Sequence, residues 1–485
     1  MNPFVLLRFG ALLLALVVFA HCKPTDPAPD SVVHRVDTMS IAQLRTLNAS
    51  VIPDKVLITD AGREGEFTLD EADLTSMDNM GVTLVTVKGH RYKRNFTGSA
   101  NVFWFGVEPS DADIGPELQT AVTATNELII PDGNYTQLTS VRIRSNLTVR
   151  ANPGKVLITL PQTYVSFVNA EDPSLPLQHV LFDGLSWNVT SRQTGVYGVI
   201  YIDGPTVSDL TVQNCTSSDA AAKDSTNWMT LKIQAGKTAT DIVVRNNNVQ
   251  AKRMACEIFN HDNYNIYAGK NITVSDNNFH DCHFGLSLSG PLTGLMVDNN
   301  LIKNCSLFGI EIAGAARNVT ITNNKFEGVF DKFLEGSNDG NGNGTVVGGM
   351  VITGNSTVGL CTGGVQLYNA GAATFSKNDF HMSGMLELTH SSAGGMYTEN
   401  TIESLSNKAV ICDNTPNNTF SRNTLSNKGN SENQATFVAY GSKSINNTLT
   451  NNKLIKGNGG KPYEAVLGGS LAASMNYDES GAPIP

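Results

Sequence analysis

The chain has 485 residues, is poor in charged side chains at 16%, and carries a formal net charge of −10. This acidic balance excludes a generically basic nucleic-acid-binding protein, because phosphate backbones are bound by clustered Lys and Arg. It also argues against a protein that binds anionic membrane surfaces. Since 40% of the residues are hydrophobic, we expect a large buried core rather than a disordered chain.

The N-terminus is predicted to be an export signal. Arg8 precedes an apolar run at 9–20, which is too short to span a bilayer and typical of the apolar region of a signal peptide. Cys22 follows, and a polar leader extends to residue 39. This order resembles a bacterial lipoprotein signal, which implies a signal peptide at 1–21, lipidation at Cys22 and an outer-membrane or cell-surface location. A plain cleaved signal, giving a periplasmic or extracellular protein, is the alternative.

The segment 40–115 is predicted to form a small N-terminal α/β region and cap. The sequence SIAQLRTL at 40–47 favours a short amphipathic helix. We expect Trp104 and a helix over 118–122 to cover one end of the next domain. Such a cover is needed because the open end of a solenoid exposes its core and its strand edges.

An internal repeat begins near residue 240, where a β-branched run is followed by Asn and an apolar residue. The aligned asparagines are Asn247, Asn277, Asn299, Asn324, Asn355, Asn378, Asn400, Asn423 and Asn452. A unit of about 22 residues cannot bury a core alone, whereas stacked copies share one. We expect each Asn to lie at one bend in left-handed geometry and to bond to the Asn of the next coil.

This repeat predicts an all-β fold, a right-handed parallel β-helix of about 11 to 13 coils over 116–456. Helical periodicity is not sustained, and the Leu ladder of a leucine-rich repeat is absent. The Gly-rich segment 457–485 is expected to form a C-terminal cap or tail.

Six cysteines besides Cys22 are widely spaced and form no CxxC zinc pattern. Cys256 and Cys412 stand between apolar neighbours, so we expect buried free thiols. A disulfide between Cys282 and Cys305 is an alternative for that pair.

A second strand lies between successive asparagines, and the alternation of side chains along it predicts an outward column. The predicted column is Tyr201, Lys232, Glu257, Ser287, Glu311, Glu335, Gln366, Glu387, Ile411 and Val438. The stacked glutamates repel one another, and this repulsion raises the pKa of each carboxyl group. A sheet face with a purely structural role does not require such an arrangement. A Gly- and Asn-rich loop at 337–343 is expected to wall one side of this column.

The glutamates of the column predict catalytic candidates at Glu311, Glu257 and Glu335. Glycoside hydrolysis uses two carboxylates, one as acid and one as base or nucleophile. Glu257 and Glu311 are two coils apart, about 9 to 10 Å between Cα atoms, which suits inversion. Glu311 and Glu335 are one coil apart, which suits retention, and the sequence does not choose between the pairs. Solvated charges on a sheet face are the plain alternative.

The residues around the glutamates predict a polysaccharide or oligosaccharide partner. The substrate-binding candidates are Lys232, Phe259, His261, Ser287, Tyr368, Glu387 and His390. Two other functions stay open, a lyase or epimerase acting on a uronate glycan and a non-catalytic adhesin-like protein. No cofactor is expected, although Ca²⁺ bound by glutamates would let the column accept a polyuronate. Nucleic acid is not an expected partner, a membrane is contacted only through a lipid anchor, and the oligomeric state is left open.

Three runs in the first third of the chain resemble the entry region of pectate-lyase-superfamily β-helix proteins, most of all the bacteriophage tailspike-like members. These runs are SIAQLRTL, RYKRNFTGSANVFWFGV and ELQTAVTATNELIIPDGNY. The resemblance covers roughly residues 40–155 in motif detail and implies the right-handed β-helix. It does not select a chemistry, because this fold carries lyases, hydrolases, epimerases and adhesins. The family's NTD, GHG, RIK and WIDH motifs are missing here.

Overall fold

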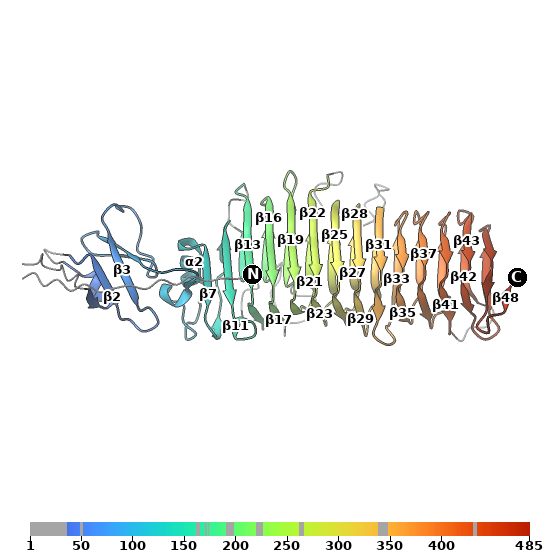
Figure 1. Ribbon diagram of the computed structural model, residues 1–485, viewed down its shortest axis with the longest axis horizontal. Helices are drawn as coiled ribbons and strands as arrows, with labels where there is room; N and C mark the ends of the chain where they lie inside the picture. Colours follow the sequence, from blue (N-terminus) through green and yellow to red (C-terminus); the bar gives the residue numbers. More distant parts are fainter. Residues whose placement is uncertain are drawn as a thin grey trace, which may run out of the picture.

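The structure is a computed structural model that describes residues 36–48, 52–161, 165–169, 172, 174–190, 198–219, 227–260, 266–337, 348–429 and 434–485. The predicted signal peptide, Cys22 and His261 lie outside the described residues. Neither described α-helix is long and apolar enough to cross a membrane. Figure 1 shows a small N-terminal sheet followed by one elongated solenoid.

The N-terminal region is a five-stranded sheet of order β1-β2-β3-β5-β4 with one short helix. Its elements are β1 (Asp37–Met39), α1 (Ile41–Arg45), β2 (Lys55–Ile58), β3 (Gly65–Asp70), β4 (Thr83–Val85) and β5 (Arg91–Arg94). Helix α1 begins with a capping box, in which the Ser40 side chain and the Gln43 side chain each bond to the other's backbone N–H. The region has a hydrophobic core of its own, which includes Leu44, Phe67 and Tyr92.

Arg94 joins this sheet to the solenoid. Its guanidinium donates to the backbone carbonyls of Arg63, Glu64 and Gly81, each at 2.7 Å. It also lies 4.3 Å from the centre of the Trp104 ring, which packs against the solenoid core. Burial lowers the pKa of Arg94 to about 10, but the three carbonyls and the ring stabilise its charge.

The solenoid begins with two short helices that cover its first coil. They are η1 (Val102–Phe105) and α2 (Gly115–Ala124), and α2 contains the predicted helix at 118–122. Leu118 and Val122 are buried in the same core as the first strands. The N-terminal end of the core is therefore closed.

Three parallel sheets form the walls of the solenoid. Sheet 1 contains β6 (Ala100–Asn101), β7 (Glu127–Ile130), β10 (Leu147–Ala151), β13 (Leu177–Asp183), β16 (Val207–Gln213), β19 (Ala239–Arg245), β22 (Gly269–Ser275), β25 (Leu292–Asp298), β28 (Arg317–Thr322), β31 (Gly348–Thr353), β34 (Thr374–Ser376), β37 (Met396–Thr398), β40 (Thr419–Ser421), β43 (Asn447–Thr450) and β46 (Leu471–Ser474).

Sheet 2 contains β8 (Gly133–Thr136), β11 (Val156–Leu160), β14 (Ser186–Val189), β17 (Thr216–Asp219), β20 (Asn248–Gln250), β23 (Asn278–His280), β26 (Leu301–Lys303), β29 (Lys325–Glu327), β32 (Ser356–Thr357), β35 (Asp379–Met382), β38 (Thr401–Ser404), β41 (Thr424–Asn427), β44 (Lys453–Ile455), β47 (Asn476–Tyr477) and β48 (Pro483–Ile484). Only β48 runs antiparallel, against β47.

Sheet 3 contains β9 (Val141–Ile143), β12 (Phe167–Asn169), β15 (Ile200–Asp203), β18 (Met229–Lys232), β21 (Met254–Phe259), β24 (Phe284–Ser289), β27 (Phe308–Ala313), β30 (Lys332–Ser337), β33 (Gly364–Tyr368), β36 (Leu386–Thr389), β39 (Val410–Asp413), β42 (Ala435–Tyr440) and β45 (Lys461–Val466). Its 13 strands correspond to about 13 coils, which confirms the predicted β-solenoid. The segment 457–485, expected as a cap or tail, supplies the last strand of each sheet and so adds a coil.

The predicted asparagine ladder lies between sheets 1 and 2. Its rungs are Asn247, Asn277, Asn300, Asn324, Asn355, Asn378, Asn400, Asn423, Asn452 and Asn476, none more than 2% exposed. In each rung the side-chain Nδ2 donates to Oδ1 of the next rung at 2.9–3.1 Å. The backbone N–H donates to the same oxygen, so the ladder ties every coil to its neighbour from 247 onward.

Three details of the predicted ladder were wrong. Asn300, not Asn299, is the rung in its coil, and Asn476 adds a rung that the repeat did not reveal. The left-handed residue is the one before each rung, such as Asn299 with φ 52° or Asn323 with φ 55°. The rung residue can therefore point inward while its predecessor makes the bend.

All six described cysteines are buried free thiols, including Cys256 and Cys412 as predicted. Burial raises the pKa of both of these thiols to about 12. Cys282 and Cys305 occupy adjacent coils and are not joined, so the alternative of a disulfide between them is wrong.

Candidate active site

The outward column on sheet 3 is formed by residues that pair with one another from strand to strand. In chain order it is Tyr201, Thr230, Glu257, Ser287, Glu311, Glu335, Gln366, Glu387, Ile411 and Val438. The three catalytic candidates and Ser287 thus occupy four consecutive coils. We call Glu257, Ser287, Glu311 and Glu335 the acidic column.

Lys232 was placed in this column by the sequence, but the structure puts Thr230 there. Lys232 lies two residues further along β18, between Asp203 and Phe259. Its Nζ is 5.9 Å from the centre of the Phe259 ring and 4.0 Å from Oδ2 of Asp203. The cation is therefore beside the acidic column and close to one of the aromatic rings that the sequence assigned to substrate binding.

Glu257 is held by two donors from the preceding coil. Nδ2 of Asn227, a fully buried side chain, donates to Oε2 of Glu257 at 2.8 Å, and the hydroxyl of Thr230 lies 3.3 Å from the same oxygen. Oδ1 of Asn227 in turn accepts from the backbone N–H of Met254 at 3.2 Å. These bonds fix the position of the carboxylate. Sequence reasoning did not find Asn227, which lies outside the strand pattern.

Glu311 is the central carboxylate of the acidic column. The hydroxyl of Ser287 donates to its Oε2, so the small side chain between Glu257 and Glu311 also orients Glu311. Glu335 pairs with Glu311 from the next coil, and both side chains are half-buried. At about 4.8 Å per coil, Cα of Glu311 is one coil from Glu335 and two from Glu257. Both predicted carboxylate pairings are thus compatible with the register.

The remaining candidates spread toward the C-terminal coils. Glu387 accepts a hydrogen bond from Nε2 of Gln366 at 3.2 Å. The rings of Tyr368 and His390 lie against each other, with centroids 4.1 Å apart. Phe259 is half-buried on the outward face of β21. The predicted loop at 337–343 falls almost wholly outside the described residues.

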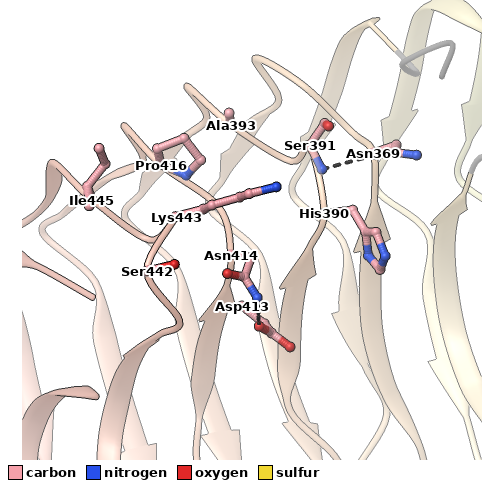
Figure 2. A pocket seen from close by; sticks show the side chains of 10 residues that line it. All are labelled: Asn369, His390, Ser391, Ala393, Asp413, Asn414, Pro416, Ser442, Lys443 and Ile445. Atoms are coloured by element: carbon pink, nitrogen blue, oxygen red, sulfur yellow. Dashed lines mark hydrogen bonds between the residues drawn. The ribbon is translucent and has the colours of Figure 1, made fainter. Parts of the chain in front are cut away.

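A pocket of about 770 Å³ opens at the turns that follow β36, β39 and β42 (Figure 2). His390, Asp413 and Lys443 line it. Asp413 and Lys443 were not predicted, although Asp413 stands two residues beyond Ile411 and so shares its outward face. In the described part of the chain, no three His, Cys, Asp or Glu side chains are grouped to hold a metal ion.

Two family models match the chain. Residues 187–380 match the right handed beta helix region, and residues 38–97 match the phage tail protein small four-stranded beta-sheet domain. The solenoid is a right-handed β-helix. The expected fold, and the resemblance to the β-helix proteins of the pectate-lyase superfamily, are thereby confirmed. No curated protein sequence matches the chain.

Solved β-helix structures share the architecture at low sequence identity. The Azotobacter vinelandii mannuronan C-5 epimerase AlgE6 A-module is 13% identical, with a TM-score of 0.50, over 79% of this chain and 100% of that one. The Acinetobacter baumannii phage AM24 tailspike is 17% identical, with a TM-score of 0.48, over 79% of this chain and 65% of that one. The Streptococcus pneumoniae adhesin PfbA is 11% identical, with a TM-score of 0.42, over 80% and 99%. This chain thus spans about two thirds of the tailspike's length, and the similarity concerns the fold.

Proposed function

We propose that this right-handed β-helix protein is a carbohydrate-active enzyme, a glycoside hydrolase that cleaves a polysaccharide with paired carboxylates. The observation that carries the proposal is the acidic column, in which Glu311 lies one coil from Glu335 and two from Glu257. Like charges at this spacing repel one another. Because the β-helix needs no charge at these positions to fold, three glutamates there have no structural role.

Glu311 takes part in either pairing, and each pairing gives a complete hydrolysis. One carboxylic acid gives its proton to the glycosidic oxygen as the bond to the anomeric carbon breaks. With Glu257 as partner, the second carboxylate removes a proton from the water that attacks this carbon, and the configuration inverts. With Glu335 as partner, the second carboxylate attacks the carbon directly, and water then releases the sugar with retention.

The test is replacement of Glu311 in an enzyme whose substrate has been found by screening plant, algal and host glycans. Glu311→Gln keeps the shape of the side chain and removes its ionisation, so turnover should fall roughly 10²-fold or more. Glu464→Gln is the matched control, because Glu464 follows Val438 in the same outward column but is bonded to Lys461 at 2.9 Å. Near-full activity of Glu311→Gln would falsify the two-carboxylate mechanism.

A second candidate is a lyase or epimerase acting on a uronate glycan. The position of Lys232 over the ring of Phe259 favours it, because a cation beside the column can neutralise a sugar carboxylate. A lyase releases a product with the ultraviolet absorbance of an unsaturated uronate, whereas a hydrolase releases reducing ends without it. Binding without any product would instead identify an adhesin-like protein.

We also propose that the protein is exported and anchored through a lipid on Cys22. The support is the sequence of the first 22 residues alone. Fractionation tests it: wild type should be recovered with membranes and Cys22→Ser in the soluble fraction. Equal partitioning of the two proteins would exclude the lipid anchor and leave a plain cleaved signal.

A further inference from the structure

The pocket near the C-terminal coils lies on the same face of the solenoid as the acidic column. Asp413 lines the pocket and belongs to the same strand, β39, as Ile411. Ile411 is three coils beyond Glu335 in the outward column. Three coils amount to about 14 Å at 4.8 Å each. An extended oligosaccharide running along sheet 3 from the acidic column would therefore reach this pocket.

The pocket contains a cation and a carboxylate that do not neutralise each other. Lys443 is exposed, extends across the pocket toward the side of His390, and forms no ion pair with any described residue (Figure 2). Asp413 accepts a hydrogen bond from Nδ2 of the neighbouring Asn414 at 2.8 Å. The two charges are thus both available to a ligand that carries an anionic group together with hydroxyl donors.

His390 occupies a left-handed turn position on the wall of the pocket. It has φ 57°, and the corresponding residues of the two adjacent coils are Asn369 with φ 56° and Asn414 with φ 54°. Because Asn occupies this turn in both adjacent coils, the turn itself does not require an imidazole. The ring instead stacks on Tyr368 and forms one wall of the pocket.

We propose that this pocket binds a carboxylate-bearing sugar, a hexuronate residue of the polysaccharide. Lys443 pairs with the carboxylate, Asp413 bonds to hydroxyls, and the ring of His390, stacked on Tyr368, packs against the sugar ring. That the hexuronate belongs to the enzyme's substrate rests on the proposed function, whereas its binding requires no catalysis. The acidic column, which would repel a uronate, is three coils away.

Calorimetric titration of the full chain with two oligosaccharides tests the proposal. Hyaluronan hexasaccharide, which contains glucuronate, should bind at least about tenfold more tightly than neutral cellohexaose, since charge-assisted hydrogen bonds are the stronger ones. Lys443→Met should remove that advantage and leave cellohexaose binding unchanged. Lys456→Met is the matched control, because Lys456 is also exposed and lies outside the pocket, and its replacement removes the same charge. Equal affinities of wild type for the two sugars, or equal losses in the two lysine variants, would overturn the proposal.

His390→Asn is a second variant that keeps the fold. Asn is native at the same turn in both adjacent coils, so the melting temperature should not fall. The affinity for the hyaluronan hexasaccharide should fall roughly fivefold with the loss of ring stacking. Unchanged affinity would contradict the assigned role of the ring. These are equilibrium binding measurements, so an active Glu311→Gln enzyme would contradict the hydrolase mechanism without altering their outcome.

Discussion

Two polar columns run along this solenoid, and they differ in burial and in regularity. The asparagine ladder is buried and repeats one residue in ten coils, with each amide bonded to the next. The outward column of sheet 3 is half-exposed at its glutamates and buried at Thr230, Ser287 and Val438, and its residue type changes over neighbouring coils. The ladder supplies the same bonds in every coil, which is a structural requirement. The residues of the outward column vary from coil to coil, so folding does not require a particular residue there. Functional residues are therefore expected in this column.

The largest expected effect is the loss of a central rung. Asn324→Ala leaves the backbone N–H of Asn300 and one of its Nδ2 hydrogens without their acceptor. These donors stay buried, so the variant should be destabilised by roughly 2–5 kcal/mol. Chemical denaturation and hydrogen exchange in the flanking coils would measure this. The control is Asn134→Ala, because Asn134 is exposed on β8 and outside the ladder. Equal stability of the two variants would mean that the ladder does not hold the coils together.

The next effect separates the two neighbours of Glu311 in the acidic column. If Glu335 is the partner, Glu335→Gln should lower turnover roughly 10²-fold and Glu257→Gln less than about tenfold, with the reverse for a Glu257 partner. Nuclear magnetic resonance of the first-formed product gives an independent answer, since a Glu335 partner requires retention and a Glu257 partner inversion. A large loss at Glu335 with an inverted product would break the assignment of roles.

The smallest effect extends the ladder by one rung. Cys215 is buried, and its backbone N–H already donates to Oδ1 of Asn247 at 2.9 Å, as a rung would. Cys215→Asn adds an amide that can donate to the same oxygen, so the protein should gain about 1 kcal/mol of stability. Thermal unfolding measures the gain, with Cys215→Ser as the control that adds no amide. A loss of stability in the Asn variant would show that the preceding coil cannot accept a rung.

Sequence periodicity sufficed for the fold because stacking makes every coil obey one pattern. The prediction from periodicity was wrong where two residues of one coil fit the repeat equally well. Asn299 and Asn300 are adjacent asparagines, and only backbone geometry decides which one bends and which one points inward. Thr230 and Lys232 both face outward, since a shift of two residues preserves alternation, and the neighbouring strands alone fix the register.

The candidate site was predictable to the same degree. Glu257 and Glu311 could be aligned because each stands between inward apolar residues of its own strand, whereas Glu335, which precedes Gly336, was placed by counting from Asn324. Asn227 and the pocket around Lys443 could not, because they belong to turns whose lengths vary between coils. Contacts that join a turn to a neighbouring coil leave no periodic signal in the sequence.

The unequal spacing of the rungs has an evolutionary consequence. Asn355 follows Asn324 by 31 residues, whereas Asn400 follows Asn378 by 22, yet the same amide bonds join both pairs. Extra residues are accommodated in the turns without disturbing the stack. A single coil is therefore a unit that in-frame duplication or deletion can add or remove, lengthening or shortening the outer face by one strand spacing each time. Selection can in this way adjust the length of the outer face while the residues at its centre stay in place.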